Sequence, residues 1–580
     1  MFDDSGSANY IHTINYAGVK HSKRHVGRCP RKPGESGRLG HARVYWLLIL
    51  AAFAPSTWSA SVDPSSAEAR FGSVHFPITA TPAAQAQFDR AVAMLHSFWY
   101  EELSREFGKV TELDPGCAMG YWGEAMGLWH PLWEPPDANT LSAGLAAVEK
   151  AKKIGAKTPR EQSYLDEIGF FYSDSTTVEH GARVQRYAKA MEKLHQLYPS
   201  DTEATAFYAL ALLAAAPPND RRYTNQLRAA ALLEQVAAVQ TNHPGVVHYL
   251  IHAYDTPTLA SRGLPEAWCY SQLAPEVPHA LHMPSHIYTR LGLWQDSIKA
   301  NLASEAAAKN YAAQVKMVGV WDEQLHAMDY LIYAYLQTAQ DRAAAGLVDE
   351  LGKITRTAPQ NFKAAYALAA IPARDLLERH QWAEAADLDV APKDFPWSNQ
   401  AWPLAMNKFA RCLGAARAGK AAEARRHFEF LSQMLPTATA APASYSVRQI
   451  GILSTEARAW TAHAEHQDEE ALRWMRDAAD QEDTIEKKPV TPGPLLPARE
   501  LLGELLLELG QPREAIAEFD KSLQEAPKRF NSLYGAGRAA TALGETDRAR
   551  GYFDQLVASC QQADSQRPEL LVARRAVEQR

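Results

Sequence analysis

A 34-residue period near the C-terminal end is the feature that most constrains how this chain can fold. Glycine, alanine and phenylalanine each recur at that spacing: Gly510 and Gly544, Ala515 and Ala549, Phe519 and Phe553. In a helix-turn-helix unit, the small residues let two helices approach, and the aromatic side chain fills the gap to the next pair. Pro527 then ends the second helix. Such units stack on their neighbours, so the period predicts a helical-hairpin solenoid and excludes a single compact core.

The same spacing returns in other parts of the chain. Gly419, Ala424, Phe428 and Pro436 mark one further unit, and residues 291–298 form the central turn of another. Strand signals are nearly absent, and alanine-rich stretches such as residues 364–370 favour helix. We therefore expect residues 70–565 to form one all-α, right-handed solenoid (an α-α superhelix) of roughly ten repeats.

Four segments carry a family resemblance. They are residues 95–102 (LHSFWYEE), 117–123 (CAMGYWG), 248–255 (HYLIHAYD) and 282–294 (HMPSHIYTRLGLW). With the 34-residue period, they resemble a family of bacterial tetratricopeptide-repeat (TPR) proteins of the secreted or envelope type. The resemblance implies a TPR-like fold and, as for TPR proteins in general, a partner-binding scaffold. It implies no particular reaction.

Changes in period and composition suggest where the parts of the chain begin and end. The main cue is a proline-rich stretch at residues 489–497, which separates a C-terminal pair of repeats. The expected parts are an extension with a signal peptide (1–60), a lead-in (61–83), a TPR-like solenoid with a His-rich groove at 243–333 (84–488), a C-terminal TPR pair (489–565) and a tail (566–580).

The N-terminal segment has the pattern of a secretory signal. Residues 1–43 carry eight Lys or Arg against three acidic residues, and the apolar run 44–54 follows. Eleven residues are too few to span a bilayer, which needs roughly 20. A basic flank, a short apolar core and small residues after it predict cleavage after Ser59 or Ala60. We expect a periplasmic or extracellular protein with no membrane span in the mature chain. The alternative is an uncleaved N-terminal anchor.

The charge of the chain argues against nucleic acid as a partner. The net charge is −7, and removal of residues 1–60 takes away eight basic and three acidic residues, which leaves −12. An acidic protein has no electrostatic reason to bind a phosphate backbone. We therefore expect a protein or peptide partner and no nucleic acid.

Histidines concentrate between residues 243 and 326. The seven in this stretch are His243, His248, His252, His279, His282, His286 and His326. His248 and His252 are four residues apart, as are His282 and His286, and the two pairs are offset by 34 residues, which is one repeat. Residues four apart lie on one helix face, so each pair is predicted to point in one direction.

Alignment on Gly292 as a turn glycine places these residues on the first helices of three consecutive repeats. In the TPR superfamily those positions line the concave groove, so we expect His279, Asp255, His326, Asp329 and Tyr333 to line it. Imidazole suits Zn, Cu, Ni or Fe. The two spaced pairs, His248 with His252 and His282 with His286, are therefore candidate ligands of one transition-metal ion. Asp255 or Asp329 could complete or orient the ligand set.

Three other interpretations of the histidines stay open. They could be packed, hydrogen-bonded core residues, contacts for an acidic peptide, or groups that respond to pH. Tyr249 and Met283 stand where a His-Glu-x-x-His metalloprotease motif would have glutamate, so a zincin mechanism is excluded. Pro284 lies inside the second pair, so either His282 lies in a loop or the helix kinks there.

Two functions from different classes follow from these observations. The first is an exported scaffold that binds a protein or ligand in its concave groove. The second is a metal-binding protein or metalloenzyme with a His-rich site. We assign no catalytic residue, and binding is the expected role ahead of catalysis.

Overall fold

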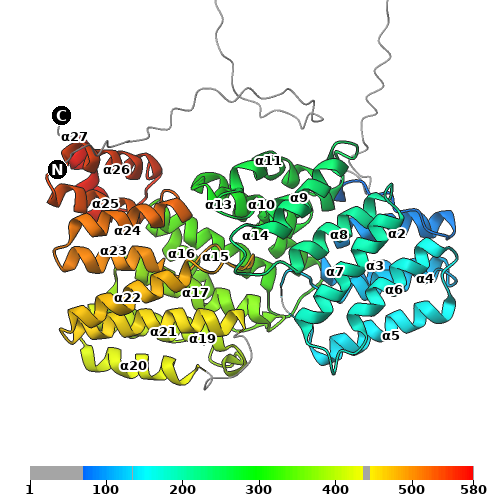
Figure 1. Ribbon diagram of the computed structural model, residues 1–580, viewed down its shortest axis with the longest axis horizontal. Helices are drawn as coiled ribbons and strands as arrows, with labels where there is room; N and C mark the ends of the chain where they lie inside the picture. The colour runs from blue at the N-terminus through cyan, green and yellow to red at the C-terminus, as the bar shows by residue number, and fades with distance from the viewer. Residues whose placement is uncertain (1–69, 134, 436–443, 579–580) are drawn as a thin grey trace, which may run out of the picture. The chain divides into compact units, whose positions relative to one another are not determined.

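The computed structural model describes residues 70–133, 135–435 and 444–578. The predicted export signal lies outside these residues. The described chain is almost entirely helical (Figure 1), and the strands assigned within it are β1 (Val320–Trp321) and β2 (Thr357–Ala358), which pair in parallel. The expected all-α TPR-like solenoid is confirmed.

The helices have the following bounds. In the first part of the chain they are α2 (Pro82–His96), α3 (Tyr100–Leu113), α4 (Ala118–Gly127), α5 (Ala138–Ile154), α6 (Pro159–Tyr172), α7 (His180–Leu197), α8 (Thr202–Ala214), α9 (Thr224–Ala237), α10 (Pro244–Tyr254), η1 (Ala260–Gly263), α11 (Leu264–Leu273), α12 (Pro278–His282), α13 (Pro284–Arg290) and α14 (Trp294–Gln314). The remainder are α15 (Asp322–Gln337), α16 (Asp341–Leu351), α17 (Phe362–Glu378), α18 (Trp382–Ala386), η2 (Trp397–Asn399), α19 (Ala401–Arg417), α20 (Ala421–Gln433), α21 (Tyr445–Ala464), α22 (Asp468–Glu482), α23 (Ala498–Glu508), α24 (Pro512–Glu525), α25 (Phe530–Ala542), α26 (Thr546–Ser559) and α27 (Pro568–Glu578).

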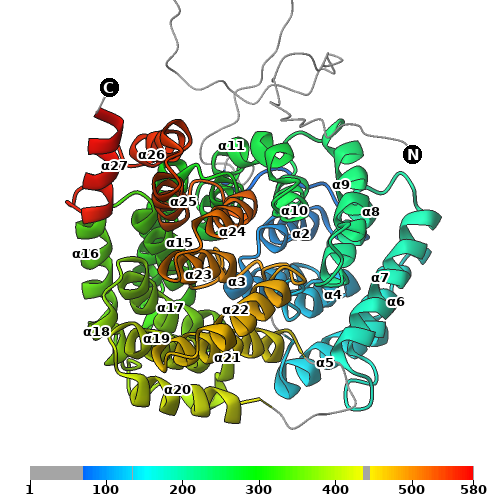
Figure 2. The ribbon, with the colours of Figure 1, turned by 60° about the vertical axis from the view of Figure 1, so that its left-hand side comes forward.

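Successive helices pack as hairpins whose tight turns carry the predicted glycines. Gly292, Gly419, Gly510 and Gly544 each lie between two packed helices and have φ between +62° and +76°. That left-handed conformation is accessible to glycine without a steric penalty. The α23–α26 region shows the stacking of two such hairpins (Figure 2).

The recurring phenylalanines fill the gaps between helices where the facing residue is glycine. A Cβ placed on Gly503 of α23 or Gly535 of α25 would lie 2.8 Å or 2.3 Å from the ring of Phe519 on α24. Phe553 has the same relation to Gly537, at 2.4 Å. The 34-residue period is therefore a packing requirement in which the ring of one helix occupies the space left by glycine on its neighbours.

The hydrophobic core runs past the expected boundary at residue 489. Trp460 on α21 and Leu501 on α23 belong to the same cluster of buried side chains. Residues 568–578, which we expected in a tail, form α27, and this helix packs against α26. Its apolar residues Leu570 and Ala573 are fully buried, which accounts for a helix at this position.

Within the described residues, no helix combines the length and the apolar character that a membrane span requires.

Candidate metal centre

Six histidines from four helices meet in the interior of the protein. The helix α10 contributes His248 and His252, α12 contributes His279 and His282, α13 contributes His286, and α15 contributes His326. All six are buried, with at most 7% of any of them exposed. The sequence analysis placed these positions on a concave groove, and in the structure their side chains are enclosed.

Packing between helices brings the two predicted pairs together. The helix α10 contacts α13, and α12 contacts α15. The nitrogens of His248, His252 and His279 lie within 4.8 Å of one another and form the first triad. Those of His282, His286 and His326 meet the same limit and form the second triad.

The helix kinks at Pro284 and does not leave His282 in a loop. The helices α12 and α13 meet at Met283, which has helical φ and ψ of −53° and −35°. Pro284 has no N–H to donate to the preceding turn, and its ring disfavours a straight helix. His282 is therefore the last residue of α12, and its ring faces that of His286 in the next helix.

In the second triad, two imidazoles point their Nε2 atoms at each other. His282 Nε2 and His286 Nε2 are 3.0 Å apart. His286 Nδ1 donates to Asp255 Oδ2 at 2.8 Å. His282 Nδ1 donates to Asn301 Oδ1 at 2.6 Å, and the amide of Asn301 is oriented by its own donation to the Ser297 carbonyl at 2.8 Å. In the neutral rings both protons are thus on Nδ1, and both Nε2 lone pairs face inward.

The first triad repeats part of this pattern. His248 Nδ1 donates to the His96 carbonyl at 2.7 Å, and its Nε2 lies 3.1 Å from His252 Nε2. Neither ring nitrogen of His279 has a hydrogen-bond partner, and neither does Nδ1 of His252. This triad is therefore unsatisfied as it stands. Each buried polar group without a partner costs about 1–3 kcal/mol of stability.

Burial keeps five of the six imidazoles neutral. It lowers the pKa of His248, His252, His282 and His326 well below the usual 6.5, and neighbouring imidazoles lower these values further. For His286, burial outweighs the hydrogen bond that the ring donates to Asp255, and its pKa falls to about 4. Neutral imidazole is the form that binds a metal ion.

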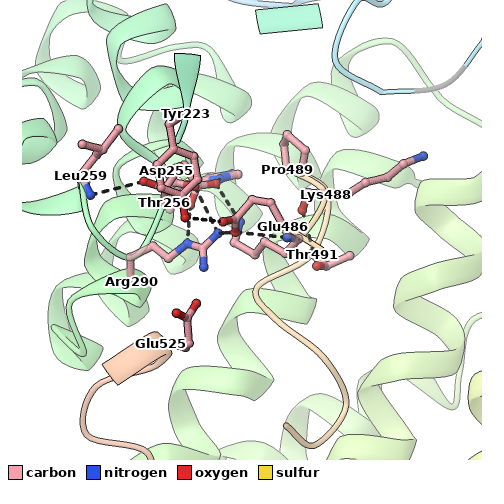
Figure 3. Close-up of polar contacts among 12 residues, drawn as sticks. Tyr223, Asp255, Thr256, Leu259, Arg290, Glu486, Lys488, Pro489, Thr491 and Glu525 are labelled. Atoms are coloured by element: carbon pink, nitrogen blue, oxygen red, sulfur yellow. Dashed lines mark hydrogen bonds and ion pairs between the residues drawn. The ribbon is translucent and has the colours of Figure 1, made fainter. Parts of the chain in front are cut away.

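Asp255 connects the histidines to two half-buried cations, Arg290 and Lys487. Its Oδ1 accepts from Arg290 Nε at 2.9 Å, and its Oδ2 accepts from Lys487 Nζ at 2.7 Å as well as from His286. Burial alone would raise the pKa of Asp255, but Lys487 and Arg290 outweigh it and hold the pKa well below its usual value. Figure 3 shows Asp255 and Arg290 together with Glu486, which also pairs with Arg290.

Residues 483–497, which we call the sealing segment, cover this region. Tyr330, whose ring centroid lies 4.6 Å from that of His282, donates to the Thr491 carbonyl at 3.0 Å. Arg374 donates to the carbonyls of Gly493 and Pro494 at 2.8 Å and 2.6 Å. Side chains of α15 and α17 thus bind the backbone of the sealing segment, as a TPR groove would bind a peptide. Of the predicted groove positions, Asp255 contacts this segment through Lys487.

Asp329 and Tyr333 do not join the histidines. Asp329 pairs with Arg374 at 3.3 Å, and the Tyr333 hydroxyl accepts from Arg529 at 3.0 Å. Tyr330 takes the place next to the second triad. It lies four residues after His326, which is the spacing found within each histidine pair. Residues with this spacing lie on one helix face, so the same rule applied to His326 could have identified Tyr330 from the sequence.

A third cluster near α2 has a different character. His96 Nε2 and His243 Nε2 each lie 2.8 Å from an oxygen of Glu203. His96 Nδ1 contacts the Tyr249 hydroxyl at 2.9 Å, and His243 Nδ1 accepts from the Val246 amide at 3.2 Å. Every ring nitrogen here has a protein partner, so this cluster is structural.

Comparison with known proteins agrees with the fold. A tetratricopeptide-repeat family model matches residues 506–572, which include α24–α26. No curated protein sequence matches the chain significantly. The chain is a TPR-like helical-repeat protein.

Solved structures show a distant likeness to IFIT1. A monomeric IFIT1 mutant with Gppp-AAAA is 12% identical, with a TM-score of 0.37, over 84% of this chain and 98% of that one. The human IFIT1 dimer with m7Gppp-AAAA is 10% identical, with a TM-score of 0.34, over 83% and 96%. Similarity at this level carries no inference about a ligand. The expected absence of nucleic-acid binding therefore stays a prediction.

Proposed function

We propose that this TPR-like scaffold binds a transition-metal ion in its buried histidine cluster, with His282 and His286 as ligands and His326 as the third. The single observation that carries the proposal is the approach of the two Nε2 atoms to 3.0 Å while both Nδ1 atoms donate elsewhere. The sequence analysis gave metal binding in the groove as the alternative to a scaffold that binds a protein or ligand through its concave groove.

Two neutral acceptors at that distance need a cation between them. Neither Nε2 carries a proton to share, so the lone pairs repel unless a positive charge lies at their meeting point. An added proton would supply that charge, but burial disfavours an imidazolium ion. A metal at 2.0–2.1 Å from each nitrogen explains the geometry, because two ligands of one tetrahedral ion lie about 3.3 Å apart.

The groups behind the ligands are those that metal sites use. A ligating histidine usually donates its other N–H to a carboxylate or carbonyl oxygen, which sets the ring orientation and raises its basicity. Asp255 has this relation to His286, and Asn301 has it to His282. An all-imidazole set favours Zn, Cu, Ni or Fe over Mg, Ca or Mn.

A protein partner would bind outside the buried cluster. A TPR-like fold is a protein- or ligand-binding scaffold, but the positions where we expected a partner are buried. We infer that any such partner uses other surfaces of the repeats. Export, with periplasmic or extracellular localisation, remains part of the proposal because of the basic and apolar N-terminal pattern.

Elemental analysis of protein purified without a histidine tag tests the metal proposal. His282→Asn and His286→Asn each keep a side-chain N–H near the position of Nδ1 and remove Nε2. We expect bound Zn, Cu, Ni or Fe in the wild type and a loss of about one equivalent in the double variant. His243→Gln is the matched control, because His243 is equally buried but lies in the satisfied third cluster. Wild-type protein that neither retains nor takes up any of these metals would refute the proposal.

A further inference from the structure

We infer that the first triad, His248, His252 and His279, holds a second metal ion, so that the cluster is a dinuclear centre with one His₃ set per ion. The inference rests on the proposed function of the second triad. It adds a site and a stoichiometry to it, because the sequence pattern suggested a single ion shared by four histidines.

His248 is oriented as a ligand by a contact from a distant part of the chain. Its Nδ1 donates to the carbonyl of His96, the last residue of α2, and its Nε2 is 3.1 Å from His252 Nε2. His286 makes the same two kinds of contact: its Nδ1 donates to Asp255, and its Nε2 faces that of His282. Both triads therefore contain a histidine whose outer nitrogen is held by an oxygen and whose inner nitrogen faces a second imidazole.

His279 distinguishes a metal site from an ordinary hydrogen bond. If His252 donated its Nε2–H to His248, the contact between the two Nε2 atoms would be a hydrogen bond and would need no metal. His279 would still be 3% exposed with both ring nitrogens unpartnered. A carboxylate oxygen of Glu323 lies 3.6 Å from His279 Nδ1, too far for a good hydrogen bond, and has no hydrogen-bond partner. An ion bound by His279 would engage one of these nitrogens and leave the other directed at Glu323.

Phe98 encloses the first triad. Its ring centroid lies 4.4 Å from that of His248, 5.9 Å from that of His252 and 5.6 Å from that of His279. Phe98 has a φ of +56°, which is uncommon for a bulky side chain. Phe98 therefore packs against all three imidazoles of the first triad and contributes to their burial.

The two triads lie next to each other. The ring centroids of His252 and His286 are 5.8 Å apart, and those of His279 and His282 are 6.1 Å apart. Each pair joins a member of one triad to a member of the other. Two ions bound to the two triads would therefore be near neighbours, each with a nitrogen-rich ligand set suited to Cu or Zn.

The third cluster shows that proximity alone does not define a site. His96, Glu203 and His243 also bring three ligand atoms within 4.8 Å, but protein groups already satisfy every ring nitrogen. We expect no ion there. The unsatisfied nitrogens of His279 and His252 set the first triad apart from this arrangement.

Titration of the metal-free full-length chain with Cu(II) and, separately, Zn(II) tests the second site. We expect saturation at about two equivalents in the wild type. We also expect about one equivalent in His279→Ala with His248→Asn, about one in His282→Asn with His286→Asn, and none in the combined variant. Circular dichroism and thermal melting of each variant show whether it is folded, and His243→Gln should bind about two equivalents. Spectroscopy supplies a test on the wild type alone: Cu(II) ions in the two adjacent triads should show magnetic coupling at two equivalents and an isolated signal at one.

The two proposals fail in different ways. Saturation of the folded wild type at one equivalent, with no coupled copper signal, would overturn the second site and leave the first. If the wild type binds two equivalents and the folded double variant, His279→Ala with His248→Asn, also binds two, the assignment of the second ion to the first triad would be overturned. No binding at all would overturn both.

Discussion

At the residue scale, Asp255 has the largest number of roles in the candidate site. One carboxylate accepts hydrogen bonds from His286, Arg290 and Lys487. It therefore orients a proposed ligand and also pairs with a cation of the sealing segment. Residues that act in this way through a ligand affect metal affinity without contacting the ion.

Asp255→Asn should weaken metal binding by about 10–100-fold, because the amide is a weaker acceptor for His286 and no longer compensates the two cations. Competition with a chelator of known affinity measures this change. Asp329→Asn is the control, since Asp329 is a buried aspartate paired with Arg374. Equal losses of affinity in the two variants would indicate a general effect of buried charge and not an orienting role.

His380 gives a second prediction at this scale. Its ring lies 3.5 Å from an oxygen of Glu504 and 3.7 Å from one of Glu569. Burial lowers its pKa, but these carboxylates outweigh burial and raise the pKa to about 9. A folded-state pKa above the unfolded value of about 6.5 stabilises the protein most below pH 6.5, and the contribution disappears as the pH rises through about 9.

Urea unfolding at pH 6 and at pH 9.5 should show this loss as about 1–3 kcal/mol in the wild type. His380→Asn should lack that part of the pH dependence, since asparagine does not titrate. If the wild type and His380→Asn show the same change in unfolding free energy between pH 6 and pH 9.5, the raised pKa of His380 would be contradicted.

At the scale of helices, the repeat is stabilised by aromatic rings packed against glycines. Phe519 is fully buried and lies between Gly503 and Gly535 on the neighbouring helices. A repeat contacts mainly its neighbours, so a defect in one repeat should first loosen the repeats beside it.

Phe519→Ala should reduce the free energy of unfolding by about 3–5 kcal/mol, because it removes a buried ring and leaves a cavity. Phe430→Ala on α20 is the control, since that ring is 41% exposed and should contribute far less. Denaturant unfolding provides the comparison, and hydrogen exchange should show α23–α25 opening before the helices around the histidines. Comparable losses of stability in the two variants would argue against the packing role of Phe519.

At the scale of the whole described chain, buried ion pairs connect helices that are far apart in sequence. Arg529, at the start of α25, pairs with Glu378 at the end of α17 and with Glu500 of α23, both at 2.7 Å. It also donates to Tyr333 of α15. Removing one partner of such a set leaves charges buried without compensation. The resulting loss of stability is larger than the net contribution of the intact ion pairs.

Arg529→Met should lower the free energy of unfolding by about 3–5 kcal/mol, because Glu378 and Glu500 would remain buried without a cation. Thermal and denaturant unfolding measure this loss. Arg548→Met is the control, since Arg548 forms its ion pairs with 46% of its side chain exposed and should change stability by less than about 1 kcal/mol. A loss no larger than that of the control would show that the network contributes little.

The sequence alone determined the features that depend on short spacing. Helical hairpins followed from the 34-residue period, and the turn positions followed from glycines that have positive φ. The pairing of His248 with His252 and of His282 with His286 followed from the helical repeat, because residues four apart lie on one face whatever surrounds them. The kink at Pro284 was one of two outcomes that backbone chemistry allowed.

Only the tertiary structure decided what surrounds those pairs. Three of these contacts join segments far apart in the chain. They are the association of His279 with His248, the hydrogen bond that the His96 carbonyl accepts, and the course of residues 483–497 over Tyr330. Periodicity constrains the direction of a side chain on its own helix but not which distant segment meets it. For the same reason the burial of the predicted groove residues did not follow from the sequence, because the repeat pattern indicates which face of a helix points inward and long-range packing determines how far that face is covered.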